Sequence, residues 1–266
     1  VTEVQTCALP IYNRSTDRTP EIVSDYATRH ENVRLIPALE RQGIGYARNV
    51  GIGAARGESV LMCDSDDVVA PGWIAALGAA LRSHDFVTGP LDVRSLNPEW
   101  VQGTRGFAIE DRPGRYLDLF DFAHSCYVGF LRQRAQEIGG FAEDMGNGSD
   151  VEFSFRMWRS GSSLYFVDSA RVAYRYRSDL GGLWRQSRGY ARAKWDIARR
   201  VRSAGIDVTV PSSRRTWLWL VRNIGLLRHR AGRARWVWTA GGAVGSLEGR
   251  RRFGPAAHSS GASPTP

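Results

Sequence analysis

Short apolar runs alternate with amphipathic segments along the first two thirds of the chain. A continuous apolar run bounded by polar residues is typical of a strand that is buried on both faces. Such runs predict strands at 33–37, 59–63 and 85–91. The amphipathic segments beside them predict helices at 17–30, 44–56 and 70–84. This alternation predicts an open α/β sheet with a site beyond the carboxyl ends of its strands.

The pattern changes after residue 91. Residues 92–125 have no clear period, and we expect them to include a loop over the site. Further on, the pattern predicts strands at 126–131, 163–168 and 171–177, and a helix at 150–160. Basic helices are predicted at 180–204 and, after a break at Pro211, at 214–230.

These elements suggest four regions. The α/β domain is expected over 12–178 and a basic helical extension over 179–253. Residues 254–266 are of low complexity and are expected to be disordered. The first residue is Val, and residues 1–11 (VTEVQTCALPI) are expected to be a non-native leader. The alternative is that they form a genuine, slightly irregular first strand.

Charge is distributed unevenly. Residues 171–253 hold 20 Arg and Lys against 4 Asp and Glu, a net charge of +16, and the remainder holds 16 against 23, a net charge of −7. An excess of this size indicates an anionic partner: a membrane surface, a nucleic acid or a phosphorylated substrate. The segment 214–238 mixes Trp, Leu and Arg, as does a helix lying in an anionic membrane interface. The alternative is a helix packed on the domain with its arginines in solvent.

Other features exclude several classes of protein. No apolar run reaches the roughly 18 residues of a spanning helix, so no bilayer-spanning segment is expected. Cys7, Cys63 and Cys126 are too far apart for a disulfide framework or a zinc site, which favours a reducing compartment, the cytoplasm. The five histidines, among them His124, lack metal-ligand spacing and are expected to be solvated or packed.

The strongest chemical signal is Asp64-Ser65-Asp66-Asp67, directly after the predicted strand 59–63. Three carboxylates in four residues repel one another, and a divalent cation with a phosphate ligand would offset the repulsion. Mg²⁺ or Mn²⁺ prefers one or two carboxylates together with phosphate oxygens. The alternative is a polar turn whose acids cap the helix that starts near Pro71.

Several motifs follow one another in a familiar order over 13–195. They are NRSTD (13–17), GIGYARNVG (43–51), DSDD (64–67), IGGFAED (138–144), GNGSDVEFSFR (146–156) and AYRYRSDLGGLWRQSRGYARAKW (173–195). In this set the sequence resembles the family-two inverting glycosyltransferases with a GT-A type fold. The resemblance implies a Rossmann-like, mostly parallel sheet flanked by helices, followed by the C-terminal helical extension.

The resemblance also implies a role for each matching residue. Asp150 matches the catalytic base, which deprotonates the acceptor hydroxyl. Asp66, with Asp64, would bind Mg²⁺ or Mn²⁺ against the donor diphosphate. The implied donor-binding residues are Ser15, Asp17, Arg48, Asn49, Asp64 and Asp67. The implied acceptor-binding residues are Gly140, Phe141, Ser149 and Trp195.

The sequence departs from the family pattern in four ways. Tyr12 replaces an acid in the first turn, and the family's first strand has no evident counterpart upstream of it. Ala173 stands where many relatives carry a metal-binding His, and Ser149 replaces a Glu. The first two departures bear on nucleotide binding, the third on metal binding and the last on acceptor hydrogen bonds.

Together these observations predict metal-assisted transfer of a sugar, with inversion, from a nucleotide-diphosphate donor to a hydroxyl acceptor. The resemblance implies a glycan or lipid-linked acceptor in surface polysaccharide or glycolipid synthesis at the cell envelope. We expect a cytoplasmic protein, peripheral on the inner face of the membrane. Nucleic acid is not an expected partner, because no recognisable nucleic-acid module accompanies the charge. The alternative is a non-catalytic relative that binds a glycan or a membrane.

Overall fold

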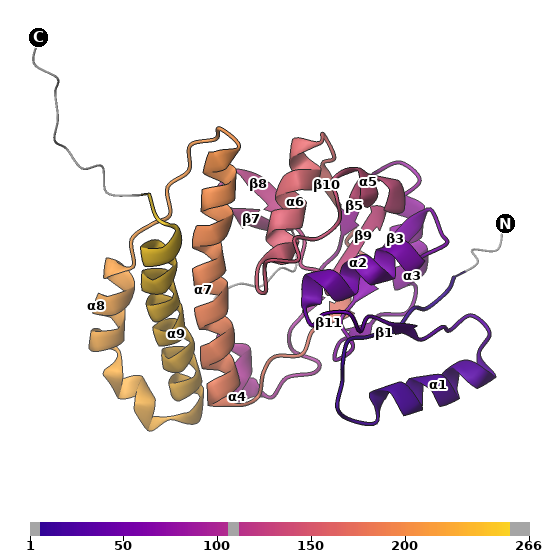
Figure 1. Ribbon diagram of the computed structural model, residues 1–266. Helices are drawn as coiled ribbons and strands as arrows, with labels where there is room; N and C mark the ends of the chain where they lie inside the picture. Colours follow the sequence, from indigo (N-terminus) through magenta and orange to yellow (C-terminus); the bar gives the residue numbers. More distant parts are fainter. Residues whose placement is uncertain (1–5, 106–111, 256–266) are drawn as a thin grey trace, which may run out of the picture. The chain divides into compact units, whose positions relative to one another are not determined.

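The computed structural model describes residues 6–105 and 112–255 and divides the chain into two compact units, 1–178 and 179–266 (Figure 1). The sequence analysis also places a domain boundary after residue 178. Part of the expected leader, 1–5, and most of the expected disordered tail, 256–266, lie outside the described residues.

The main sheet of the first unit has four strands in the order β10-β5-β9-β3. The strands are β3 (Ser59–Cys63), β5 (Phe86–Thr88), β9 (Tyr127–Leu131) and β10 (Leu164–Phe166). β10 is parallel to β5, whereas β9 lies between β5 and β3 and is antiparallel to both. The α/β class is confirmed, but the sheet is mixed rather than mostly parallel. An apolar run reveals a strand and not its direction, so this difference was not visible in the sequence.

The remaining strands form three small sheets. β11 (Val172–Ala173) pairs with β4 (Val68–Val69) and β6 (Leu91–Asp92) beside the acid turn. β7 (Gly114–Tyr116) and β8 (Phe120–Phe122) form a hairpin in the segment expected to be a loop.

The predicted strand 85–91 divides into β5 and β6 around Gly89 and Pro90. A Cβ at Gly89 would lie 2.1 Å from the carbonyl oxygen of Ala170, so this bend needs a glycine.

A strand does precede the first turn. β1 (Ile11–Tyr12) is parallel to β2 (Ile36–Pro37), and a bridge between Ala8 and Val33 extends the ladder. The expectation that the first strand has no counterpart upstream of the turn is therefore wrong. The ladder is short, and only three residue pairs define it among the described residues.

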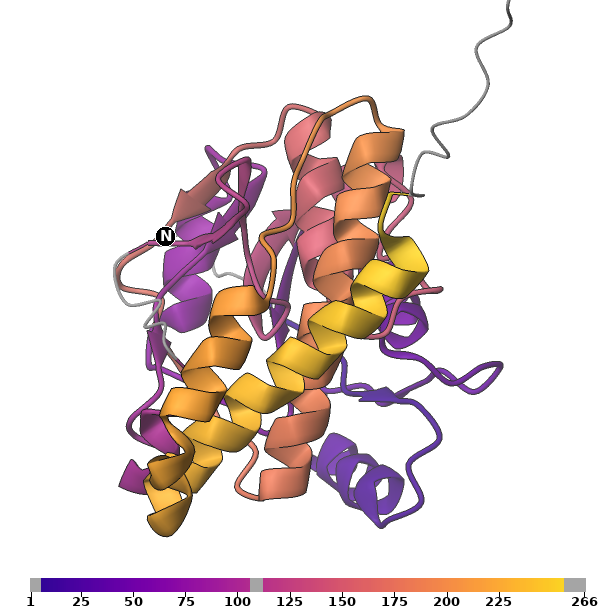
Figure 2. The same ribbon diagram turned by 90° about the vertical axis from the view of Figure 1, so that its left-hand side faces the viewer.

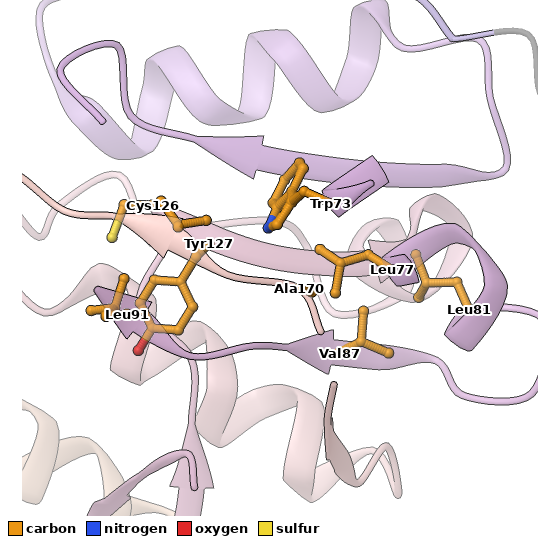
Figure 3. Packing of buried hydrophobic residues seen from close by; sticks show 9 residues of the cluster. Trp73, Leu77, Leu81, Val87, Leu91, Cys126, Tyr127 and Ala170 are labelled. Atoms are coloured by element: carbon orange, nitrogen blue, oxygen red, sulfur yellow. The ribbon is translucent and has the colours of Figure 1, made fainter. Parts of the chain in front are cut away.

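Helices pack on both faces of the main sheet. They are α2 (Ile44–Ala54), α3 (Trp73–Ala80), α5 (Arg132–Glu137) and α6 (Ser149–Arg159), and the unit also contains α1 (Thr19–Arg29) and α4 (Glu99–Gln102). On one face Trp73 and Leu77 of α3 pack against Val87 and Tyr127 (Figure 3). On the other face, alternate strand residues such as Phe86 and Phe130 pack against α2, α5 and α6. The period-two alternation of the strands thus builds both cores.

The second unit is helical. It comprises α7 (Leu180–Ser203), α8 (Arg214–Arg222), a 3₁₀ turn η1 (Ile224–Arg228) and α9 (Arg230–Phe253). The predicted helix 214–230 is thus an α-helix followed by a 3₁₀ turn. The long helix α9 was not foreseen as a separate element. Among the described residues, no helix is both long and apolar enough to cross a membrane.

Glycines bring α7 and α9 very close together (Figure 2). Gly241, Gly245 and Gly249 are four residues apart and face the backbone of α7. A Cβ at Gly245 would lie 2.1 Å from the carbonyl oxygen of Arg188, which is far inside van der Waals contact. The absence of side chains at these positions is what allows this approach.

Candidate active site

The acid turn lies at the end of β3 and is held by the segment that follows β11. The backbone N–H of Arg175 donates to Asp67 Oδ1 over 2.8 Å, and its Nε donates to the carbonyl oxygen of Asp66 over 3.0 Å. Arg177 Nη1 lies 3.7 Å from Asp66 Oδ2. The acids do not cap α3, because that helix begins after Gly72 without a side-chain cap. The alternative interpretation of the turn as a cap is therefore wrong.

Arg48 connects the acid turn to the start of α6. Its Nη2 lies 4.0 Å from Asp64 Oδ1, and its Nη1 donates to Ser149 Oγ over 3.1 Å. The guanidinium also lies over the ring of Phe141, 5.2 Å from its centroid. Residues from three distant segments of the chain therefore meet around one largely buried cation.

Asn49 ties α2 to the Gly-Gly-Phe segment. Its Nδ2 donates to the carbonyl oxygen of Phe141 over 2.9 Å and to Glu143 Oε1 over 2.8 Å, while its Oδ1 accepts from Phe141 N over 2.7 Å. Gly140 has a φ of +71°, and a Cβ there would lie 2.4 Å from Asn49 Oδ1. Asn49 and Gly140 therefore act together to position this loop beside Arg48.

Asp150 lies in the first turn of α6, after Gly148 in the left-handed region. Its Oδ1 accepts from Val151 N over 2.9 Å, and its Oδ2 lies 3.4 Å from Nδ1 of His124. Burial raises the pKa of this carboxyl, but the hydrogen bond and charge of His124, with Arg48, outweigh it and hold the pKa below its usual value. Asp150 therefore remains ionised and able to accept a proton.

The carboxyls of Asp64 and Asp67 in the turn both have raised pKa values. Burial raises the pKa of Asp64, and the carboxylates of Asp66 and Asp150 add to the increase against the opposing Arg48. Burial, with the charges of Asp66 and Asp64, raises the pKa of Asp67 to about 7 despite the hydrogen bond from the N–H of Arg175. The charge of Asp150 thus contributes to the raised pKa of Asp64, so the two carboxylates lie near each other in this site.

The turn offers ligands for a divalent cation. Single ligand atoms of Asp64, Asp67 and Cys126 all lie within 4.8 Å of one another. Asp67 Oδ2 is buried and has no hydrogen-bond partner. Burial raises the pKa of the Cys126 thiol well above its usual value, so it stays protonated and is a poor ligand. The carboxylate oxygens therefore suit a hard cation such as Mg²⁺ or Mn²⁺.

The structure does not bring every predicted site residue to this centre. Asp17 is exposed and its Oδ1 accepts from Thr19 N over 3.0 Å; neither it nor Ser15 has a contact with the acid turn among the described residues. Asp66 faces Arg177 and is outside the group of Asp64, Asp67 and Cys126. The metal ligands suggested by this geometry are Asp64 and Asp67, where the sequence suggested Asp66 and Asp64.

All four predicted acceptor-binding residues, Gly140, Phe141, Ser149 and Trp195, are buried. Phe141 stacks on Phe153 with ring centroids 4.3 Å apart, and Ser149 accepts from Arg48. Trp195 belongs to the helical unit, where its indole N–H donates to Ser246 Oγ over 3.1 Å. Among the described residues, Phe141 and Ser149 support Arg48 and Trp195 packs α7 on α9, and acceptor binding by these residues stays a prediction.

Sequence reasoning missed several contributors. His124 comes from the segment without a clear period, and only its place just before an apolar strand could have suggested a role. Arg175 and Arg177 are in the quoted motif 173–195 but were given no role. Asn13 also holds the loop before α2, since its Oδ1 accepts from Gly43 N over 3.0 Å and its Nδ2 donates to the carbonyl oxygen of Arg41 over 2.9 Å.

Curated proteins that are similar to this chain are named as glycosyltransferases. "Pre-mycofactocin glycosyltransferase" of Mycobacterium tuberculosis (strain CDC 1551 / Oshkosh) is 24% identical over 166 residues, 59% of this chain and 35% of that protein. "Uncharacterized glycosyltransferase YwdF" of Bacillus subtilis (strain 168) is 29% identical over 157 residues, 56% of each chain. The chain thus spans about half, or less, of the length of these curated relatives.

The solved mannosyltransferase PcManGT from Pyrobaculum calidifontis, in complex with GDP-Man and Mn²⁺, superimposes with a TM-score of 0.60 at 17% identity. The match covers 91% of this chain and 77% of that chain. This likeness shows the GT-A type fold. The model of the family described as "Glycosyl transferase family 2" matches residues 9–138, which include Arg48 and the acid turn and end before Asp150. Through residues 9–138, the chain is therefore similar to glycosyl transferase family 2.

Proposed function

We propose that the chain transfers a sugar from a nucleotide-diphosphate donor to a hydroxyl group of an acceptor. The observation that carries this proposal is the position of Arg48 between two carboxylates. It lies 4.0 Å from Asp64 on one side and is bonded on the other to Ser149, the neighbour of Asp150. The acid turn that would hold the departing diphosphate and the Asp150 base for the acceptor therefore both lie beside the Arg48 guanidinium. The match to the family model over 9–138 and the names of the relatives support the same reaction class.

The donor diphosphate would bind at the acid turn. Arg48 is placed to contact the diphosphate or the sugar, and Asp64 and Asp67 would hold Mg²⁺ or Mn²⁺ there. A divalent ion at this position offsets negative charge on the leaving diphosphate. The Mn²⁺ in the similar mannosyltransferase complex supports this assignment. The strained acids of the turn and the unpartnered Asp67 Oδ2 are what such an ion would relieve.

Asp150 would act as the general base. As the acceptor oxygen bonds to the anomeric carbon, the bond to the diphosphate breaks and the hydroxyl proton passes to the Asp150 carboxylate. The hydroxyl becomes acidic as its oxygen forms the new bond, so a carboxylate with a lowered pKa is a sufficient base. His124 Nδ1, 3.4 Å from Asp150 Oδ2, holds this carboxylate in place. A single displacement of this kind inverts the configuration at the anomeric carbon. We propose a glycan or lipid-linked acceptor, as in surface polysaccharide or glycolipid synthesis.

Asp150→Asn tests the proposal, because it keeps the shape of the side chain and removes the base. Donors are first identified by thermal shift with a panel of UDP- and GDP-sugars and Mn²⁺. Turnover is then measured as released nucleoside diphosphate. We expect turnover to fall about 100-fold or more while donor affinity is kept. Asp168→Asn, at an exposed acid of the same unit, is the matched control and should be unchanged.

Wild-type turnover in Asp150→Asn would refute the base assignment. Donor binding without hydrolysis or transfer by the unmodified chain would refute the enzyme assignment and favour the non-catalytic alternative.

A further inference from the structure

The outer side of α8 and η1 is apolar and exposed. Trp217, Leu218, Val221 and Ile224 are 37%, 56%, 73% and 62% exposed. At about 100° per residue, the three residues on α8 fall on one side of that helix. The opposite side is packed: Leu220 is buried against Ala240 and Ala243 of α9. We call the four exposed residues, with the exposed Arg214, Arg215 and Arg222, the docking face.

The docking face is strongly basic. Arg214, Arg215 and Arg222 are on the same exposed side of α8 as the apolar residues. No Asp or Glu occurs between Asp207 and Glu248, whereas seven arginines do. Any partner must therefore accept apolar side chains and positive charge over the same few turns of helix.

We propose that the docking face binds the surface of an anionic lipid bilayer. Such a surface offers apolar acyl chains just beneath negatively charged headgroups, which matches both properties of the face. A second copy of the chain would bring arginines against arginines. A nucleic acid would neutralise the arginines but would leave Leu218, Val221 and Ile224 in water. Charge complementarity combined with exposed apolar area therefore favours lipid over both.

The docking face is held by packing before any membrane is present. Trp236 Nε1 of α9 donates to the carbonyl oxygen of Leu220 over 3.1 Å, and the Arg235 guanidinium lies 5.4 Å from the ring centroid of Trp219. Because α8 is already helical and fixed to α9, docking needs no folding step. The far-ultraviolet circular dichroism spectrum should therefore change little when vesicles are added.

Vesicle co-sedimentation of the full chain tests the proposal. We expect binding to vesicles of phosphatidylglycerol and phosphatidylcholine, and far weaker binding to phosphatidylcholine alone. The variant Leu218→Asp/Val221→Asp should bind roughly tenfold more weakly or worse, because two inserted side chains become charged. Arg214→Gln/Arg215→Gln/Arg222→Gln should bind about 100-fold more weakly, since each arginine near the surface contributes about fivefold.

Matched controls carry the same changes on the first unit. Ile22→Asp/Tyr26→Asp alters two exposed apolar residues of α1, and Arg56→Gln/Arg82→Gln/Arg159→Gln removes three exposed arginines. Both should bind vesicles within about twofold of the unmodified chain, apart from the small effect of net charge. Circular dichroism and thermal unfolding verify that every variant is folded. Donor turnover need not change in any of them, so this test is independent of the proposed function.

Three results would overturn the proposal. One is no binding of the unmodified chain to anionic vesicles, even at low salt. Another is binding that Leu218→Asp/Val221→Asp leaves intact, together with equal binding to duplex DNA, which would identify a general polyanion surface. The third is a dimer in sedimentation velocity that this same variant dissociates, which would make a second copy the occupant.

Discussion

Asn49→Asp exchanges one amide nitrogen for oxygen at the junction between α2 and the Gly-Gly-Phe segment. The variant keeps the bond from Phe141 N to Oδ1 and loses both bonds donated by Nδ2. A carboxylate oxygen then stands where Nδ2 stood, 2.8 Å from Glu143 Oε1 and 2.9 Å from the carbonyl oxygen of Phe141. The change is therefore nearly neutral in shape and strongly unfavourable in electrostatics.

The expected cost follows from these contacts. Losing a bond to a neutral carbonyl costs about 1 kcal/mol, and losing a bond to a carboxylate costs about 1.5–3 kcal/mol. Repulsion between two carboxylates at the partly exposed Glu143 adds about 1 kcal/mol or more, although Arg41, 2.6 Å from Glu143 Oε2, reduces it. We expect Asn49→Asp to lower the free energy of unfolding by about 4 kcal/mol at pH 8. In acid the two carboxyls can share a proton, so the deficit should be smaller at pH 5.

Urea unfolding at pH 8 and pH 5, followed by circular dichroism, measures this difference. Asn32→Asp is the matched control, because it makes the same chemical change at an exposed residue. A stability at pH 8 within about 0.5 kcal/mol of the unmodified chain would refute the bracing role of Asn49. An equal deficit at both pH values would refute the repulsion with Glu143.

Two further changes test the helical unit and the base. Gly245→Ala places a Cβ 2.1 Å from the carbonyl oxygen of Arg188, and overpacking should lower the stability of the second unit by about 1–3 kcal/mol in thermal unfolding. Gly242→Ala, whose Cβ would meet Ser187 Oγ at 3.2 Å, is the control and should cost less; equal effects would argue against the close helix contact. His124→Phe removes a group that lowers the pKa of Asp150, so the pKa of Asp150 should rise. The acid limb of the pH profile of kcat/KM should then move to higher pH. An unchanged acid limb would contradict the pairing of His124 with Asp150.

Local pattern predicted the elements whose signal lies within one segment. The strand 59–63 was predicted at its observed bounds because an apolar run ends at a cluster of acids. The helix α9 was not foreseen, because its glycines lower helix propensity and only contact with α7 compensates. The division of strand 85–91 at Gly89 likewise depends on the distant Ala170. Features set by contacts between distant segments were the ones that sequence reasoning missed.

The same distinction applies to the site. Motif order indicated Arg48, Asn49, Asp64 and Asp150, and the structure brings these side chains into one centre. Motif order could not indicate how deeply a side chain is buried, and Phe141 and Ser149, which the resemblance assigned to acceptor binding, are buried beside Arg48. Nor could it find His124, since the hydrogen bond to Asp150 spans 26 positions of chain.

Arg175 and Arg177 contact the acid turn through two hydrogen bonds and an ion pair, just before the helical unit begins. Ser178 is the last residue of the first unit, so one residue separates Arg177 from the helical unit. Substitutions at Arg175 or Arg177 should therefore alter the position of Asp66 and Asp67 through these contacts.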